Sequence, residues 1–361
     1  MPELEPSYKH GPLPSFVMQN FLKPAQRDSV AIVNGSTGVQ LTYLELYCRT
    51  YSLAAGLKRE FKVGNGDVVA ICAPSHDFFF IFFHAVALAG GITTTINPQY
   101  TTDEVKYQID LTRTKLIIAH PMSLATAKAA AGGRIPVVSI CGDDAVESLL
   151  HELKDPAQID TEAFLSPKTK GFDEHAVVTI PFSSGTTGRS KGVMLSHRNL
   201  TSNVLQTMPY EGKYLLKEHS KSGERGVLLC PLPFYHIFAM TAGMMVSTYC
   251  GAKLVFLPQF DLQRYLELIQ EHKVSRGHVV PPIVLALAKH PMVDKYDLTS
   301  LECLMSGAAP LGAEVQLAAA KRLNCIVKQA WGMTETSPCG TITPDDDVIR
   351  LGLEAVVGRS G

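Results

Sequence analysis

Short β-branched runs alternate with longer amphipathic segments along most of this chain. Residues 68–73 form an apolar, β-branched run, and residues 42–57 have helical spacing behind a threonine that can cap a helix. Further on, residues 103–111 have the pattern of a helix and residues 115–119 that of a buried strand. This alternation predicts an α/β fold with mainly parallel sheets covered by helices.

The alternation is interrupted once, which divides the chain into two regions. Residues 142–174 are acidic and have only weak helical patterns. At roughly 100–200 residues per domain, 361 residues leave room for two or three units. We therefore expect a first α/β subdomain at 1–142, a connecting segment at 143–175, and a second α/β subdomain at 176–361 that holds the site.

Composition excludes several classes of protein. Apolar residues make up 46% and charged residues 19%, so the chain can build a large core and is not disordered over most of its length. The net charge of -1 argues against a nucleic-acid-coating role. The apolar stretches at 78–92 and 227–258 are interrupted by histidine, glycine, proline or lysine, so we expect core and no transmembrane segment.

The N-terminus and the cysteines bear on the cellular compartment. Residues 1–14 are polar and proline-rich, without the pattern of a secretory leader. The eight cysteines include no C-x-x-C pair and no zinc spacing, which suits buried free thiols in a reducing compartment. We expect a cytoplasmic protein; a peroxisomal location stays open for a longer form, and oligomeric state is not predicted.

The most informative segment runs from residue 177 to 193. A β-branched run leads into small hydroxyl residues and glycines, followed by Lys191 and a second apolar run, with a helix start near 196–199. Glycine lets backbone N–H groups approach anionic oxygens closely, and hydroxyls and a lysine add donors and charge. The loop therefore predicts polyphosphate binding. It is not a Walker A loop, because two residues separate Gly188 from Lys191, so a P-loop NTPase is disfavoured.

Later segments repeat the strand-then-turn pattern. Residues 301–305 are strand-like, 306–309 form a small-residue turn, and Pro310 can open a helix over 312–323. Residues 326–335 form another strand and loop, ending in a threonine hydroxyl and a carboxylate, the type of oxygen ligand that Mg²⁺ prefers.

Together these motifs resemble those of the AMP-forming acyl–adenylate synthetases. Their sequences are most similar to those of 4-coumarate–CoA ligases and fatty-acyl relatives. The resemblance covers nearly the whole chain and rests on motifs in the family's order: 97–101, 183–193, 233–238, 260–261, 280–285, 305–311 and 332–335. It implies two stacked αβα-type subdomains of the family's large N-terminal domain. It also implies that most of the distorted β-barrel part and the small C-terminal domain are absent from these 361 residues.

The resemblance further implies a reaction in two steps. A carboxylic acid and ATP give acyl-AMP and pyrophosphate, and CoA then displaces AMP. We expect the 361 residues alone to be weak or inactive, with an incomplete CoA site. A shortened, non-catalytic isoform that binds nucleotide or acid is the alternative.

Site residues follow from the same resemblance. Catalytic roles are implied for Lys191, His236, Thr334 and Glu335, with Glu335 also the Mg²⁺ ligand. Nucleotide contacts are implied for Ser183, Ser184, Gly185, Thr186, Thr187, Gly188, Lys191, Ala308, Ala309, Pro310, Gln329, Trp331, Gly332 and Thr334. The acid pocket is implied to comprise His236, Phe238, Met305, Ala308, Gly332 and Pro338.

The pocket positions are small or apolar, which suits an aromatic or aliphatic tail. The implied acids are an aromatic one, such as a hydroxycinnamate, or a medium-chain fatty acid. Relatives often carry tyrosine where Phe238 stands, and the missing hydroxyl weakens the case for a phenolic acid.

Overall fold

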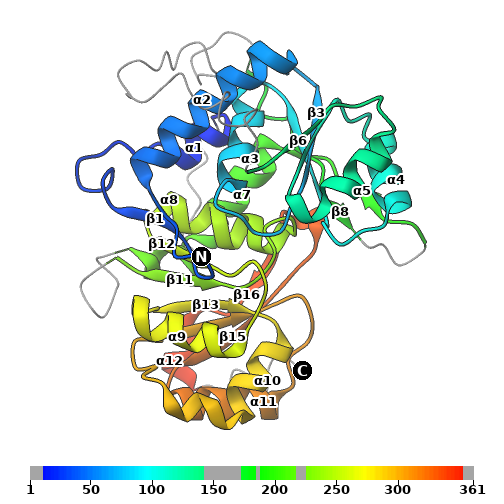
Figure 1. Ribbon diagram of the computed structural model, residues 1–361. Coiled ribbons are helices and arrows are strands. Elements are labelled where there is room, and N and C mark those ends of the chain that lie inside the picture. Colours follow the sequence, from blue (N-terminus) through cyan, green and yellow to red (C-terminus); the bar gives the residue numbers. More distant parts are fainter. Residues whose placement is uncertain (1–10, 142–171, 184–187, 217–224, 353–361) are drawn as a thin grey trace.

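The computed structural model describes residues 11–141, 172–183, 188–216 and 225–352. Two large sheets lie one above the other, each with helices against it (Figure 1). Apart from antiparallel pairs at their edges, both sheets are parallel. The predicted α/β class is confirmed.

The upper sheet has six strands in the order β10-β7-β4-β3-β5-β6. Their bounds are β3 (Val68–Cys72), β4 (Ile92–Ile96), β5 (Leu116–Ala119), β6 (Val137–Ser139), β7 (Val177–Thr179) and β10 (Leu195–Ser196).

The lower sheet has eight strands in the order β16-β15-β14-β13-β11-β12-β1-β2. Their bounds are β1 (Val30–Asn34), β2 (Gln40–Thr42), β11 (Val227–Cys230), β12 (Lys253–Phe256), β13 (Arg276–Val279), β14 (Cys303–Ser306), β15 (Ile326–Gly332) and β16 (Cys339–Ile342). A separate two-stranded hairpin consists of β8 (Phe182–Ser183) and β9 (Lys191–Gly192).

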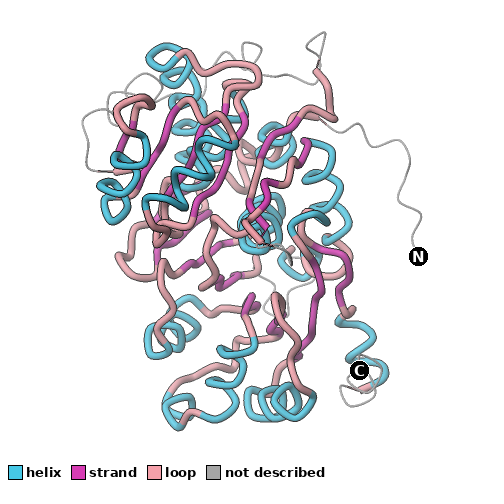
Figure 2. Tube along the Cα trace, turned by 90° about the vertical axis from the view of Figure 1, so that its right-hand side faces the viewer, coloured by secondary structure: helices cyan, strands magenta, loops and turns pink. Residues whose placement is uncertain are grey.

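Helices flank the strands of both sheets, as the view turned by 90° also shows (Figure 2). The α-helices are α1 (Leu13–Met18), α2 (Tyr43–Phe61), α3 (Phe79–Leu88), α4 (Thr102–Leu111), α5 (Pro121–Ala131), α7 (His197–Thr207), α8 (Val246–Cys250), α9 (Leu262–His272), α10 (Pro281–Lys289), α11 (Ala313–Leu323) and α12 (Asp345–Leu351). A π-helical segment, η5 (Phe238–Met245), precedes α8, and short 3₁₀ turns are η3 (Gly212–Leu215), η6 (Pro291–Lys295) and η7 (Thr334–Thr336).

Local signals in the sequence account for several of these elements. The Thr42 side chain caps α2 and Glu45 reaches back to its backbone, which completes a capping box. The same arrangement begins α4 at Thr101 and α7 at Ser196. The predicted elements at 42–57, 68–73, 103–111 and 115–119 are therefore confirmed. Pro310, which was expected to open the helix at 312–323, lies before it in a turn. Helix α11 begins at Ala313, with Gly312 as its N-cap.

Strand β3 shows how the upper sheet is buried on both faces. Val69 and Ile71 belong to the core cluster that includes residues of α2 and α3, whereas Ala70 and Cys72 belong to the cluster that includes residues of α4 and α5. Successive side chains of a strand point to opposite faces of the sheet. A strand covered by helices on both faces therefore needs apolar residues at consecutive positions, as in β3.

Sheet membership does not follow the predicted bounds at 1–142 and 176–361. Strands β1 and β2, near the start of the chain, pair within the lower sheet, and β7 and β10 pair within the upper one. Most of the predicted connecting segment lies outside the described residues. The division into domains at those bounds stays a prediction. The composition of the sequence does not indicate which strands pair within one sheet.

The two long apolar stretches lie in the core, as expected. Every residue of α3 is buried, and the second stretch is divided among β11, η5, α8 and β12. Among the described residues, no helix combines the length and apolar character that crossing a membrane requires.

Candidate active site

A cavity of about 410 Å³ lies where the carboxyl ends of strands from both sheets meet. Thr95 and Asn97 come from the end of β4, Met305 and Ala308 from the end of β14, and residues 330–334 from the end of β15. Parallel α/β sheets place their ligand sites at the carboxyl ends of strands. This cavity therefore has the position expected of an active site.

His236 lies in the turn between β11 and η5 and faces the cavity. Its Nδ1 accepts a hydrogen bond from the backbone N–H of Phe238 at 3.3 Å. Burial lowers the pKa of His236, so the imidazole is neutral near pH 7. A neutral ring that accepts on Nδ1 carries its proton on Nε2, which leaves one donor for a bound ligand.

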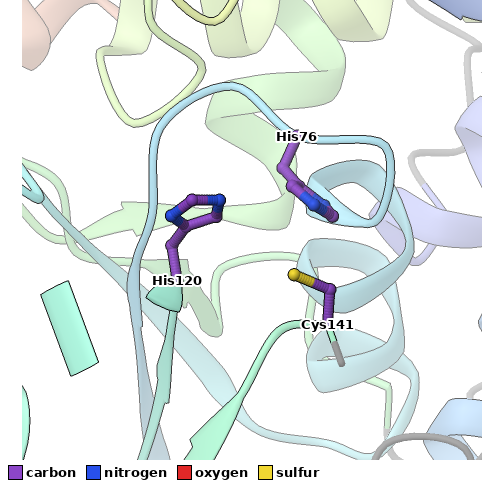
Figure 3. Close-up of side chains that lie close together, drawn as sticks. All are labelled: His76, His120 and Cys141. Atoms are coloured by element: carbon purple, nitrogen blue, oxygen red, sulfur yellow. The ribbon is translucent and has the colours of Figure 1, made fainter. Parts of the chain in front are cut away.

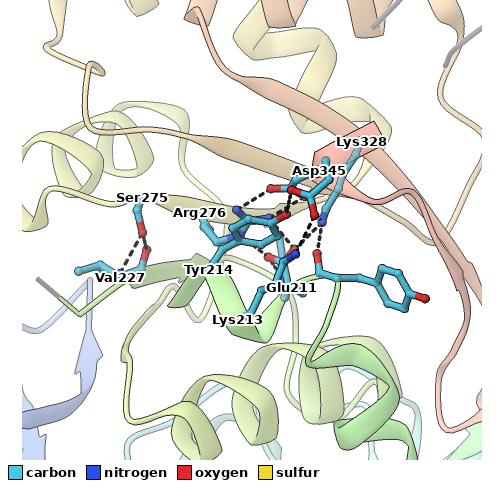
Figure 4. Close-up of polar contacts among 11 residues, drawn as sticks. Glu211, Lys213, Tyr214, Val227, Ser275, Arg276, Lys328 and Asp345 are labelled. Carbon is cyan, nitrogen blue, oxygen red and sulfur yellow. Dashed lines mark hydrogen bonds and ion pairs between the residues drawn. The ribbon is translucent and has the colours of Figure 1, made fainter. Parts of the chain in front are cut away.

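Phe238 forms part of the cavity wall and is held from behind. Its ring stacks on the buried His278, with ring centroids 5.6 Å apart and planes at 19°. Nε2 of His278 lies 3.2 Å from a carboxylate oxygen of Glu211. The wall is thus connected to the buried ionic cluster of Glu211, Arg276, Lys328 and Asp345 (Figure 4).

The turn after β14 brings backbone to the cavity. Ala308 has a φ of +71°, a left-handed conformation that costs a residue with a β-carbon some energy. Ala308 lines the cavity, while Ala309 and Pro310 are exposed in the same turn. Gln329 holds this turn: its Oε1 accepts from Leu311 N at 3.1 Å and its Nε2 donates to Leu311 O at 3.2 Å. Both ends of the Gln329 amide thus have partners within the protein. The nucleotide contact implied for Gln329 stays a prediction.

The loop after β15 is folded tightly on itself. A β-carbon at Gly332 would lie 2.1 Å from the carbonyl oxygen of Pro338, so only glycine fits there. Asn203, from α7, donates to the carbonyl oxygens of Thr336 and Cys339 at 3.2 and 2.8 Å and accepts from Cys339 N at 3.2 Å. These contacts hold Thr334, which is buried and lines the cavity.

Trp331 and Glu335 lie on the same loop but differ in orientation. Trp331 is 58% exposed and lines the cavity, with its ring over the backbone of Gly340. Glu335 is exposed and borders a neighbouring hollow beside α7, and it makes no ion pair with the described residues. A free carboxylate suits a hard divalent cation, so Glu335 fits the Mg²⁺ role in its chemistry.

The predicted phosphate loop is only partly described. Ser183 and Lys191 are paired opposite each other on the hairpin of β8 and β9; Ser183 lines the cavity, and Lys191 is exposed. Gly188 has a φ of +129°, which favours glycine. Ser184, Gly185, Thr186 and Thr187 lie outside the described residues. The Tyr107 hydroxyl donates to the carbonyl of Ser190 at 3.1 Å and ties the loop end to α4.

Sequence reasoning missed the part of the cavity that comes from the first region. Thr95, Asn97, Tyr100 and Gln108 line it, and Oε1 of Gln108 is buried without a hydrogen-bond partner among the described residues. Tyr235, beside His236, was missed as well. The available signal was Asn97, a polar residue directly after the buried strand β4.

Comparisons with known proteins agree with this geometry. The family model described as AMP-binding enzyme matches residues 23–358, so the chain belongs to that family. The chain is 37% identical over 331 residues to 4-coumarate–CoA ligase 2 of Petroselinum crispum, covering 91% of this chain and 58% of that protein. It is 35% identical over 336 residues to 4-coumarate–CoA ligase 4 of Arabidopsis thaliana, covering 91% and 57%. The chain thus spans less than two thirds of the length of these relatives.

Solved structures show the same fold. ATP-bound MatB from Rhodopseudomonas palustris aligns with a TM-score of 0.78 and 26% identity, covering 94% of this chain and 62% of that one. The luciferase-like enzyme from the nonluminescent Zophobas morio mealworm aligns with a TM-score of 0.82 and 20% identity, covering 97% and 78%. The predicted match to the large N-terminal domain of adenylate-forming enzymes is confirmed.

Proposed function

We propose that this chain carries the nucleotide and acid sites of an AMP-forming acid–thiol ligase. In the whole protein, a carboxylic acid attacks the α-phosphorus of ATP, giving acyl-AMP and pyrophosphate, and the thiol of CoA then displaces AMP. The acid is an aromatic one, such as a hydroxycinnamate, or a medium-chain fatty acid.

The observation that carries this proposal is the shared cavity. Met305, Phe238 and Pro338 offer apolar surface for an acyl tail, while His236 and Thr334 offer polar groups in the same space. An apolar pocket with a few convergent polar groups is the usual form of a small-molecule site. The hairpin with Ser183 and Lys191 borders this space, which would place phosphates beside the acid carboxylate.

The chemistry asks the protein for position and charge rather than covalent help. Nε2–H of His236 would donate to the acid carboxylate, and the Thr334 hydroxyl to an α-phosphate oxygen. Mg²⁺, when bound, neutralises charge on the phosphate oxygens, and Glu335 would be its protein ligand.

Acid-dependent ATP–pyrophosphate exchange tests the proposal directly. We expect exchange to require an acid with an apolar tail, and dicarboxylic or strongly polar acids to give none. Coumarate, cinnamate and medium-chain fatty acids should be compared, since the wall residue Phe238 offers no hydroxyl for a phenol. Mg-ATP and acid binding to the 361-residue chain should be measured in parallel by calorimetry. Because the 361 residues alone are expected to be weak or inactive, exchange should be measured on this chain and on a lengthened one. Absence of both exchange and nucleotide binding would refute the proposal, whereas nucleotide binding without exchange in the lengthened chain as well would support the non-catalytic alternative.

Replacing Lys191 with alanine should weaken Mg-ATP binding. A hydrogen bond to a charged group contributes about 1.5–3 kcal/mol, which corresponds to roughly 10- to 100-fold in Kd. Lys289→Ala, which removes a lysine at the end of α10, is the matched control and should bind ATP as the parent chain does. An unchanged Kd for Lys191→Ala by calorimetry would remove the lysine from the phosphate site.

A further inference from the structure

Three turns of the upper sheet bring together two histidines and a cysteine that do not line the cavity described above. His76 follows β3, His120 follows β5, and Cys141 follows β6. These strands are neighbours in the order β3-β5-β6 and run parallel, so their carboxyl ends share one edge of the sheet. Residues distant in sequence therefore meet there.

The three side chains point toward a common space (Figure 3). One ligand atom from each residue lies within 4.8 Å of the others, and all three residues are half-buried. We propose that His76, His120 and Cys141 form a binding site for a borderline-soft divalent metal ion, Zn²⁺ being the representative ion. Two imidazoles and a thiolate are ligands that Zn²⁺ prefers, and a water would complete four-coordination.

The two imidazoles are already in the neutral form that metal binding needs, whereas the thiol must lose a proton. Burial lowers the pKa of His76 to about 4, and it also lowers the pKa of His120, so both rings are neutral near pH 7. Burial, with the nearby Asp77 carboxylate, raises the pKa of Cys141, so the free thiol keeps its proton. Metal binding releases that proton to solvent as the metal–sulfur bond forms.

Both rings have a weak competing contact on Nδ1. Backbone N–H groups of Phe78 and Met122 donate to Nδ1 of His76 and His120, each at 3.2 Å. A metal at Nε2 would move the ring proton to Nδ1 and break this bond, and a metal at Nδ1 would replace it. In either case two long hydrogen bonds are exchanged for two metal–nitrogen bonds.

A second observation also favours a cation. Asp77 lies next to His76 in sequence, and its Oδ1 is buried without a hydrogen-bond partner among the described residues. A nearby cation would compensate this carboxylate. A second close group among the described residues, Glu211, Cys303 and Asp345, is a poor candidate, because Arg276 and Lys328 already neutralise its carboxylates.

The site would also restrain the loop that carries it. Ser75, one residue before His76, accepts a hydrogen bond from Phe234 N at 3.0 Å and donates to Leu232 O at 3.2 Å. Phe234 lies two residues before His236. A bound ion would therefore restrict the motion of the loop at Ser75, which is hydrogen-bonded to the segment that leads to His236 in the cavity.

Zn²⁺ titration against a competing chelator tests the site independently of enzymatic activity. We expect about one Zn²⁺ per chain, and weakening of about 10²-fold or more in Cys141→Ser and His76→Gln, because even partners of metal ligands contribute 10- to 100-fold. Co²⁺ should give a thiolate charge-transfer band that Cys141→Ser abolishes. Added Zn²⁺ should raise the Tm of the parent chain.

His290→Asn is the matched control, since His290 also accepts a backbone N–H on Nδ1 at 3.2 Å but belongs to no such cluster within the described part of the chain. It should leave Zn²⁺ affinity unchanged. His120→Asn keeps a capping side chain at the start of α5, so lost affinity there reports a lost ligand. Equal affinity in the parent chain and in Cys141→Ser and His76→Gln, or no thiolate band with Co²⁺, would overturn the proposal.

Discussion

Replacing Arg276 with methionine is expected to lower the free energy of unfolding by about 3–5 kcal/mol, because removal of one partner leaves buried charge uncompensated. The Arg276 side chain is 1% exposed and binds two carboxylates. Its Nε and one terminal nitrogen donate to Glu211, each at 2.8 Å, and the other terminal nitrogen donates to Asp345 at 2.9 Å.

The arrangement around Arg276 explains why the loss should be large. Lys328 is fully buried and donates to Glu211 at 2.8 Å and to Asp345 at 2.6 Å, so two cations balance two carboxylates. Burial by itself would raise the pKa of Glu211. The cations Arg276 and Lys328 outweigh burial and hold this pKa well below its ordinary value. Without Arg276 one negative charge has no counterpart.

Urea unfolding at pH 7 measures this effect. Arg134→Met removes one of two exposed partners of Asp110, the other being Lys106, and should cost only about 0–1 kcal/mol. A difference between the two variants below about 1 kcal/mol would contradict a stabilising role of the cluster. Because the folded pKa of Glu211 is lowered, its stabilisation is complete above the unfolded pKa, about 4.3, and is lost as pH falls through the folded pKa.

Replacing His236 with alanine should reduce the rate of acid-dependent exchange by about 10²–10³-fold, the usual effect of removing one donor to developing charge. The structural basis is the neutral ring whose Nδ1 accepts from Phe238 N, which directs the remaining donor into the cavity. This prediction rests on the proposed function.

Exchange rates at saturating ATP, measured for the parent chain and His236→Ala, test this donor. His290→Ala, outside the cavity, should leave the rate unchanged. Since burial lowers the pKa of His236, the rate should not fall through protonation of this ring until pH is below about 6.5. A rate for His236→Ala within about threefold of the parent would exclude the donor role, provided that the variant binds ATP normally.

Much of the fold was predictable because its signals are local. Threonine or serine followed three residues later by a glutamate or asparagine fixed the starts of α2, α4 and α7. The apolar, β-branched run at 68–73 indicated a strand, which β3 confirms. The ordered motifs predicted the family, and the family model confirms it.

Candidate site residues were predicted less completely. His236, Phe238, Met305, Ala308, Gly332, Thr334 and Pro338 do line one cavity. Their roles toward nucleotide and acid stay predictions, as do those of Lys191, Glu335 and Trp331. Thr95, Asn97 and Gln108 were missed, because they meet the rest of the cavity only through the stacking of two sheets.

The sequence by itself determined the elements, their caps and the family, since these depend on residues a few positions apart. Only the tertiary structure decided which strands share a sheet, that Arg276 and Lys328 are buried between Glu211 and Asp345, and that His76, His120 and Cys141 meet. Those outcomes depend on contacts between residues tens to more than a hundred positions apart. No local pattern specifies them, because burial and pairing are properties of the packed chain.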